Sequence, residues 1–392
     1  MVPVLALLAI CRVSVQAEDY SKVWNQVSTA ISTSYYDRKK RKEDMDRLLA
    51  KYKPIASSAS SRDEFEKAVN DMIQEFHDSH FAFLTPADQT FFVMDGLASS
   101  TPKPMPEFGA WFQKGQDGYT ISMVLEGTSA AQAGLRKGDI VEKIDGSPFT
   151  PVKSLTGLAG KRVSLVVRRA GREIPIDVEV NSIPAMDMFL KASGDSQRVL
   201  DVNGRKVGYY HLWTQSGDKF KNSLSGAVYG SLANTDAMIL DLRDGFGGRP
   251  EGYADPFFRP DLRIVWDTAG NKLNELFGYQ RPLVVLINQG SRSAKEVLSY
   301  ILKKSKRAKL IGLTTAGHVL GTFPMKINDW AYLEIPMVDV ITDGFRIEGV
   351  GVSPDIAVPR EFDDSGKDLV LERALQELKN VKVGDHSQPQ PR

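Results

Sequence analysis

Short apolar runs alternate with helical stretches between residues 199 and 359, and this alternation constrains the fold more than any other feature of the chain. Residues 294–304 carry apolar side chains at helical spacing, which predicts a buried helix face. Strands that alternate with helices build an α/β core, which we assign to residues 183–378. The strand-like runs are residues 207–213, 237–242, 283–287 and 308–312.

A second pattern, of short alternating strands, occupies residues 106–182. Turns are expected at Asp145-Gly146 and Ala170-Gly171, and a short helix is expected over residues 129–135. The expected strands are residues 119–125, 140–144, 163–168 and 174–180. These signals predict a compact β-rich module that precedes the α/β core.

The chain before the β-rich module is rich in charge and has the period of amphipathic helices, so we assign residues 18–105 to a helical N-terminal region. Ser61 is followed three residues later by Glu64, which is the capping-box pattern of a helix start. The proline-rich run of residues 101–106 then interrupts the period. It predicts a linker between the helical region and the module.

Both ends of the chain differ from its interior. Residues 1–17 form a short apolar run that ends in Val15-Gln16-Ala17, a small-x-small pattern, which predicts a secretory signal peptide. No Lys or Arg precedes the run, so a buried N-terminal strand is the alternative. The leader implies a secreted or periplasmic protein, with the periplasm preferred. Residues 379–392 are polar and contain proline, which predicts a disordered tail.

Charge and cysteine content exclude several classes of protein. Lys and Arg number 50 against 49 Asp and Glu, so no overall field favours a nucleic acid or an anionic membrane. The single cysteine, Cys11, lies in the expected leader, so the mature chain is neither a disulfide scaffold nor a thiol enzyme. The five histidines lack zinc-binding spacing, and no glycine loop for phosphates is present. We expect no metal and no cofactor.

A strand that leads through a serine-rich turn into a helix is the first candidate for chemistry. Residues 283–287 continue through Gly290, Ser291 and Ser293 into the helix expected at residues 294–304. A serine at a helix N-terminus lies beside free backbone N–H groups and the positive end of the helix dipole, which stabilise an oxyanion. Taken alone, the simpler interpretation is that Ser291 or Ser293 caps the helix.

Two other segments have compositions that suit a serine nucleophile. Residues 241–248, Asp-Leu-Arg-Asp-Gly-Phe-Gly-Gly, follow an apolar strand, and glycine N–H groups can form part of an anion hole. A simple strand-ending turn is the alternative. Residues 76–81 place His77, Ser79 and His80 close together, and histidine is the commonest general base for a serine.

Taken together, these segments resemble the family of exported C-terminal processing, or tail-specific, serine proteases, including the branch that is similar to the tricorn core protease. The resemblance covers roughly residues 65–359 and follows the family's order. Its motifs are Asp-Ser-His at 78–80, a PDZ-like module, Leu-Arg to Gly-Gly at 242–248, Gly-Ser-Arg-Ser-Ala-Lys-Glu at 290–296 and Gly-Val-Ser-Pro-Asp at 351–355. It implies a ClpP/crotonase-like catalytic core with an inserted PDZ domain at 106–182.

The resemblance assigns roles to several residues. Ser293 takes the position of the nucleophile, and the backbone N–H groups of Gly247 and Ala294 take that of the oxyanion hole. PDZ domains bind a peptide as an added strand and hold its terminal carboxylate on backbone N–H groups. A PDZ domain that serves only as a spacer or lid is the alternative. The residues that correspond to its carboxylate-binding loop are Phe108, Gly109, Ala110 and Trp111.

The general base is where this chain departs from most of the family. Tail-specific enzymes usually pair the serine with a lysine about 25 residues downstream, and here that position is His318. The tricorn-like branch uses instead the histidine of a Ser-His pair, which Ser79-His80 matches, and a distant glutamate, for which Glu348 is suitably placed. His318 stays open as an alternative base. Lys295 is expected to be a solvated helix residue.

The function that follows is that of an exported serine endopeptidase whose PDZ domain binds substrate C-termini. His80 takes the proton of Ser293, Ser79 and Glu348 orient His80, and water hydrolyses the acyl-enzyme. The alternative is an inactive or His318-dependent relative that binds peptides or other ligands. Expected partners are peptides or unfolded proteins, with no nucleic acid and no stable membrane span, and the oligomeric state is left open.

Overall fold

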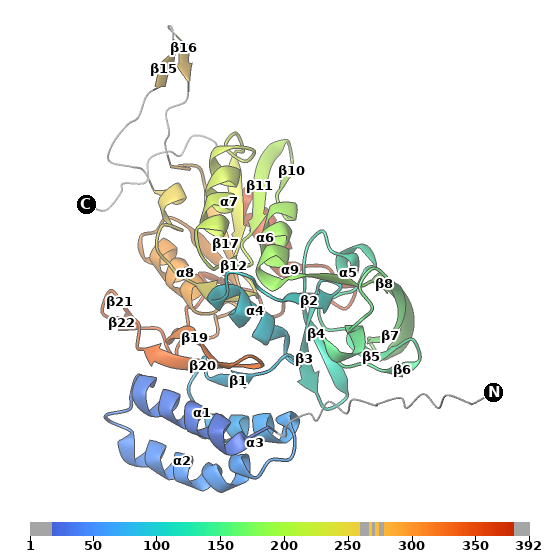
Figure 1. The fold of residues 1–392 in the computed structure, drawn as a ribbon. Coiled ribbons are helices and arrows are strands. Elements are labelled where there is room, and N and C mark those ends of the chain that lie inside the picture. The colour runs from blue at the N-terminus through green and yellow to red at the C-terminus, as the bar shows by residue number, and fades with distance from the viewer. Residues whose placement is uncertain (1–17, 259–265, 269–270, 274–277, 380–392) are drawn as a thin grey trace, which may run out of the picture.

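The computed structural model describes residues 18–258, 266–268, 271–273 and 278–379 (Figure 1). The predicted signal peptide lies outside the described residues, and so does the predicted tail except for its first residue. That residue, Lys379, ends a helix rather than beginning a disordered tail. No helix within the described ranges is both long and apolar enough to cross a membrane.

Three amphipathic helices form a layer at the N-terminal end: α1 (Tyr20–Ser34), α2 (Lys42–Ser57) and α3 (Arg62–Gln74) (Figure 1). Helix α3 begins at the predicted cap, because the Ser61 hydroxyl accepts a hydrogen bond from the Glu64 N–H at 3.2 Å. The apolar faces of these helices share one core with a three-stranded sheet. Helix α4 (Gln89–Ala98) follows that sheet's first strand.

This sheet joins the N-terminal region to a distant part of the chain. Its order is β1-β20-β19, from β1 (Ala82–Leu84), β20 (Ala331–Val338) and β19 (Gly321–Asn328). Strand β1 pairs antiparallel with β20, so the segment that carries His80 is anchored beside residues more than 200 positions later. None of these three strands is among those predicted from the sequence.

The β-rich module has all four of its predicted strands, within one or two residues of the expected limits. They belong to a sheet in the order β3-β4-β5-β7-β8, with β6 paired to β5. The module also contains the short helix α5 (Ser129–Gln132) and the 3₁₀ turn η1 (Lys153–Leu155). The strands are β3 (Ala110–Gly115), β4 (Gly118–Val124), β5 (Ile140–Ile144), β6 (Ser147–Pro148), β7 (Arg162–Arg169) and β8 (Arg172–Glu179).

The predicted linker at residues 101–106 is wrong in its second half. Strand β2 (Pro104–Glu107) pairs antiparallel with β9 (Asn181–Pro184), so the chain enters and leaves the module side by side. Prolines are tolerated because the pair forms an isolated two-stranded ribbon with free outer edges. Met105, between Pro104 and Pro106, is fully buried, which the proline-rich composition of this run did not indicate.

The α/β core contains a mixed sheet in the order β10-β11-β13-β17-β18-β23, in which only β10 runs antiparallel to its neighbour. The helix predicted at residues 294–304 is present with these limits as α8 (Ala294–Lys304). The strands are β10 (Arg198–Val202), β11 (Arg205–His211), β13 (Ala237–Asp241), β17 (Leu283–Ile287), β18 (Lys309–Gly312) and β23 (Ile356–Ala357).

Helices cover both faces of this sheet (Figure 1). Alternate strand residues point to opposite sides, so Met238 and Leu240 share a core with α6 (Ala185–Asp195), α7 (Asp218–Tyr229) and α8. Ala237 and Ile239 pack instead against α9 (Leu369–Lys379). The remaining elements are β12 (Thr214–Gln215), β14 (Phe246–Gly248), η2 (Asp255–Phe257), β15 (Trp266–Thr268), β16 (Asn271–Leu273), β21 (Ile341–Thr342) and β22 (Phe345–Arg346).

Candidate active site

The segments that follow three neighbouring parallel strands meet at one edge of the central sheet. Strand register pairs His211 with Asp241 and Asp241 with Leu286, so β11, β13 and β17 end side by side. In open α/β sheets, ligands bind outside the carboxyl ends of the strands. The glycine loop and the serine-rich turn singled out from the sequence both lie at this edge.

Ser293 is the N-cap residue of α8, directly after the turn that leaves β17. Its φ of 58° is in the left-handed region, which strains a residue that has a side chain. Its backbone N–H donates to the His318 carbonyl at 2.7 Å, and the Ser291 hydroxyl donates to the Leu242 carbonyl at 2.8 Å. Strain that the surroundings hold in place is typical of residues at functional sites.

Gly247 lies against this serine. A Cβ atom on Gly247 would stand 2.6 Å from the Ser293 hydroxyl oxygen and 3.0 Å from the backbone nitrogen of Ala294. Only glycine therefore allows the loop backbone to approach so closely. The structure brings together the three residues that the resemblance gave to the nucleophile and the oxyanion hole.

A buried carboxylate to which the sequence analysis gave no role holds the nucleophile turn in place. One oxygen of Glu296 accepts the backbone N–H groups of Ser293 at 3.1 Å and His318 at 2.9 Å. The other accepts the N–H of Gly317 at 2.7 Å and the hydroxyl of Thr315 at 2.5 Å. Burial raises the pKa of Glu296, and these hydrogen bonds oppose the shift. Its signal in the sequence was the Ser-x-x-Glu capping pattern.

His80 reaches the site from the segment between α3 and β1. Its Nδ1 lies 3.1 Å from the Ser79 hydroxyl, and its ring centroid lies 6.5 Å from that of His318. Burial, and after it the positive charge of Arg292, lower the pKa of His80 to about 3. The ring is therefore neutral at neutral pH and can accept a proton.

Two contacts expected around the predicted general base, His80, are not formed among the described residues. Within the described residues, no hydrogen bond joins the Ser293 hydroxyl to either His80 or His318. Catalytic hydrogen bonds are often long before substrate binds. Glu348 accepts the backbone N–H groups that follow His318, at 3.1 Å from Leu320, instead of contacting the Ser79–His80 pair. Its role in orienting His80 stays a prediction.

Lys295 is buried, so the prediction of a solvated helix lysine is wrong. Its Nζ donates to the backbone carbonyls of Asp244 at 2.6 Å and Arg243 at 3.4 Å. Burial lowers the pKa of Lys295 to about 7. The helix turns this position toward the glycine loop, whose carbonyl groups need donors, so Lys295 ties that loop to α8.

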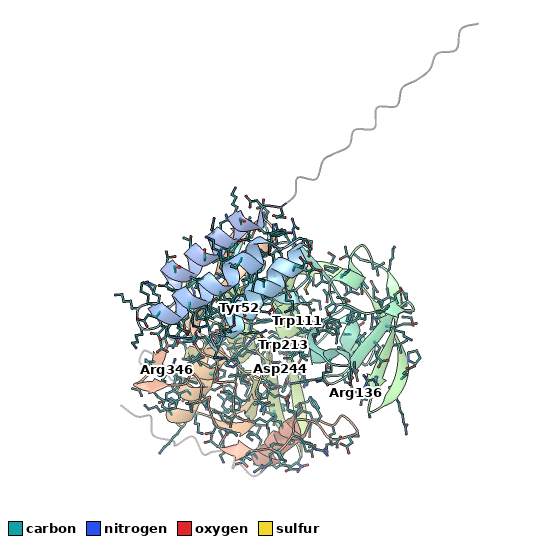
Figure 2. All side chains as sticks on the ribbon, turned by 90° about the horizontal axis from the view of Figure 1, so that it is seen from below. Tyr52, Trp111, Arg136, Trp213, Asp244 and Arg346 are labelled. Carbon is teal, nitrogen blue, oxygen red and sulfur yellow. The ribbon has the colours of Figure 1, made fainter. Side chains whose placement is uncertain are left out.

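The β-rich module contacts the same glycine loop. Lys137, from the module, forms an ion pair of 2.8 Å with Asp244. Glu126 accepts the indole N–H of Trp213 at 2.6 Å and lies 2.9 Å from Nδ1 of the buried His211. A cavity of about 230 Å³ lies between module and core, and its lining includes Trp213 and Asp244. Figure 2 labels these two residues near the middle of the molecule. His211 therefore links the two parts.

The loop predicted to bind a peptide carboxylate is tightly packed. Gly109 has a φ of 92°, and a Cβ there would meet the Thr128 side chain at 2.1 Å. Phe108 is buried in the core of the module, with Ala110 beside it at the start of β3. Trp111 is buried on the other side, with its ring centroid 4.9 Å from that of Phe189.

A side chain from the N-terminal region already contacts the backbone beside this loop. Strand β3 is an edge of its sheet, where a peptide would add as a further strand. The carboxamide of Gln89, in α4, donates to the Ala110 carbonyl at 2.9 Å and accepts the Phe112 N–H at 3.0 Å. Gln89 therefore occupies one donor and one acceptor that a bound peptide would use.

Models of three known families match segments of this chain. Residues 206–358 match the model of peptidase family S41, residues 120–169 that of the PDZ domain, and residues 16–76 that of the tricorn protease C1 domain. Within the described ranges, no three His, Cys, Asp or Glu side chains are grouped as a metal site.

Curated relatives match over most of the chain. Carboxyl-terminal-processing peptidase 2 of Arabidopsis thaliana, a chloroplastic protein, is 28% identical over 340 residues, which cover 77% of this chain and 62% of that protein. A probable CtpA-like serine protease of Staphylococcus aureus (strain N315) is 25% identical over 371 residues, which cover 87% of this chain and 69% of that one. The chain thus spans roughly two thirds of the length of these relatives.

Solved structures share the fold. The photosystem II D1 C-terminal processing protease superposes with a TM-score of 0.56 at 19% identity, covering 89% of this chain and 96% of that one. The tricorn protease gives a TM-score of 0.54 at 18% identity, covering 92% of this chain and 36% of that one. With the family matches, these likenesses confirm the resemblance to C-terminal processing proteases. Residues 206–358 therefore match peptidase family S41, within a chain that is similar to C-terminal processing proteases and has segments that match the PDZ domain and the tricorn C1 domain.

Proposed function

We propose that the chain is an exported serine endopeptidase that cleaves peptides or unfolded proteins. One observation carries this proposal: Ser293 is held in a strained conformation at the start of α8, with Gly247 so close that a Cβ would stand 2.6 Å from its hydroxyl oxygen. A nucleophile, a helix N-terminus and a glycine backbone converge there, as acyl transfer requires.

The proposed mechanism assigns one step to each group. His80 accepts the proton of Ser293 as the serine oxygen attacks the scissile carbonyl, and the N–H groups of Gly247 and Ala294 stabilise the oxyanion. With Nδ1 protonated and donating to Ser79 at 3.1 Å, Nε2 is left free to take that proton. His80 then protonates the leaving amine, and water hydrolyses the acyl-enzyme. His318 is the alternative base.

The proposed domains are a signal peptide at 1–17, a helical region at 18–105, a PDZ domain at 106–182, a protease core of the ClpP/crotonase type at 183–378 and a tail at 379–392. The leader is the basis for a secreted or periplasmic location. Because similar proteins are named as C-terminal processing proteases, C-terminal processing is the activity to test first. The PDZ domain would bind the substrate's C-terminus.

Gly247→Ala is expected to lower kcat by at least about 10²-fold, the usual loss when one oxyanion donor is removed. The added methyl group would overlap Ser293 and displace the loop backbone. Gly194→Ala, in α6, is the matched control because a Cβ there meets nothing within 4 Å. Peptide hydrolysis by the two variants is the measurement. Equal activities would remove Gly247 from the oxyanion hole.

Amidation of a peptide's C-terminus is expected to weaken its binding by roughly tenfold, because the PDZ loop loses a charge-assisted contact. Gln89→Ala should strengthen binding of the free acid by roughly threefold to tenfold, since it removes two competing hydrogen bonds. Dissociation constants and cut sites, found by mass spectrometry, test both points. Equal binding of acid and amide would reduce the PDZ domain to a spacer.

A further inference from the structure

One charged side chain beside the nucleophile has no part in the mechanism above. Arg292 directly precedes Ser293 and is half-buried. Its guanidinium carbon lies 4.7 Å from the ring centroid of Phe246, the residue before Gly247. The guanidinium therefore packs against the loop that carries Gly247, while the backbone of Arg292 adjoins Ser293.

Within the described residues, the guanidinium of Arg292 forms neither an ion pair nor a hydrogen bond. Arg243, at the same edge of the sheet, shows the usual arrangement, because it pairs with Asp241 at 2.6 Å and Asp368 at 2.7 Å. A half-buried charge without a counter-ion is unfavourable in the resting protein. An arginine that stacks on an aromatic ring also keeps its N–H edge available for a carboxylate.

The neighbouring carboxylates do not neutralise it. The negative charges of Glu334, on β20, and of Asp244 favour the charged form of Arg292, but neither carboxylate lies within the 4 Å of an ion pair. Asp244 is already bound by Lys137 at 2.8 Å. Burial raises the pKa of Glu334, which weakens it as a permanent counter-ion. Among the described residues, the guanidinium next to the nucleophile is therefore left without a paired carboxylate.

We propose that Arg292 binds a carboxylate of the substrate next to the scissile bond and so determines specificity. The carboxylate is either an acidic side chain or the free C-terminus of a substrate cut close to its end. This inference rests on the proposed peptidase function. Binding would also offset the positive charge that disfavours a protonated His80, so the preferred substrate would assist its own cleavage.

The test measures binding by the full chain with Ser293→Ala, which prevents turnover. The probes are four forms of one short dye-labelled peptide, with Glu or Gln at its centre and a free or amidated C-terminus. Forms with the relevant carboxylate should bind roughly 10- to 100-fold more tightly than the neutral form. Adding Arg292→Gln should abolish a preference for Glu and should reduce a preference for the free end to the part that the PDZ domain supplies, whereas Arg292→Lys should keep part of the difference. Arg47→Gln, an exposed arginine on α2, is the matched control.

The four peptides distinguish the two possible sources of the carboxylate, and the binding measurement distinguishes failure of this proposal from failure of the peptidase function. A preference for Glu identifies a side-chain carboxylate, and a preference for the free end identifies the C-terminus. Equal binding of all four forms contradicts the proposal, and so does a set of preferences that Arg292→Gln leaves unchanged in size; a free-end preference unchanged in this way would belong to the PDZ domain. Because binding is measured without turnover, a chain that cleaves nothing still gives an answer. Labelling of Ser293 in the unmutated chain tests the peptidase function separately.

Discussion

Replacing Ser293 by alanine is expected to reduce peptide hydrolysis by about 10⁴- to 10⁶-fold, the loss typical of a removed serine nucleophile. A cysteine cannot form the acyl-enzyme in its place, because the mature chain proposed here has no cysteine. Initial rates on a fluorogenic peptide measure the effect. The fold should survive, because alanine removes only the hydroxyl and leaves the backbone contacts of residue 293 in place.

Ser291→Ala provides the comparison for this result. Ser291 is buried and its hydroxyl donates to the Leu242 carbonyl at 2.8 Å, so its loss should lower stability by about 1 to 3 kcal/mol. Activity per folded molecule should largely remain. If Ser291→Ala were inactive and Ser293→Ala active, the nucleophile would be assigned to the wrong serine of the turn.

His80→Ala is expected to lower kcat by about 10⁴-fold or more, because the serine would lose its general base. His318→Ala should leave substantial activity, since the His318 ring is exposed and only its backbone contacts Ser293. The pKa of His80 is lowered to about 3, so the ring stays neutral down to mildly acidic pH. In the parent enzyme, kcat/KM should therefore stay flat between about pH 8 and pH 5.

The opposite pattern would change the assignment of the base. If His318→Ala were inactive and His80→Ala active, His318 would be the base in the position where most of the family has lysine. A fall in kcat/KM near pH 6.5 would likewise contradict the lowered pKa of His80, because an unperturbed histidine titrates there. Circular dichroism of both variants separates these outcomes from loss of the fold.

The parts of the fold that depend on local pattern were predictable. The buried strand before Ser293 and helix α8 were found with their observed limits, because five consecutive apolar residues and then helical spacing leave few alternatives. The strands of the module were found for the same reason. Gly247 was identified from its loop, and its closeness to Ser293 follows once β13 and β17 are neighbours.

Features that depend on contacts between distant segments were not predictable. Strand β1 has three residues, too few for a periodic signal, and it forms only because β20 lies beside it. Lys295 has the sequence context of a surface residue, and its burial follows from carbonyl groups on another strand's loop. Glu348 was assigned by its distance along the chain, whereas the structure turns its carboxylate to the backbone after His318.

The site is built from strained residues on separate segments. Ser293, His80 and Asp244 have φ values of 58°, 55° and 50°, and they come from the turn before α8, the segment before β1 and the glycine loop. Each strained residue needs surrounding contacts to hold it. Glu296 and Lys295 supply such contacts for the turn and the loop, so loss of either should loosen the site as a whole.

The most direct test of the central claim is covalent labelling of the purified chain by a serine-directed fluorophosphonate, read by intact mass. The unmutated protein should gain one label, while Ser293→Ala and His80→Ala should gain none. This result would establish an activated serine that depends on His80. Labelling of Ser293→Ala at another residue, or equal labelling of His80→Ala and the unmutated chain, would contradict the account.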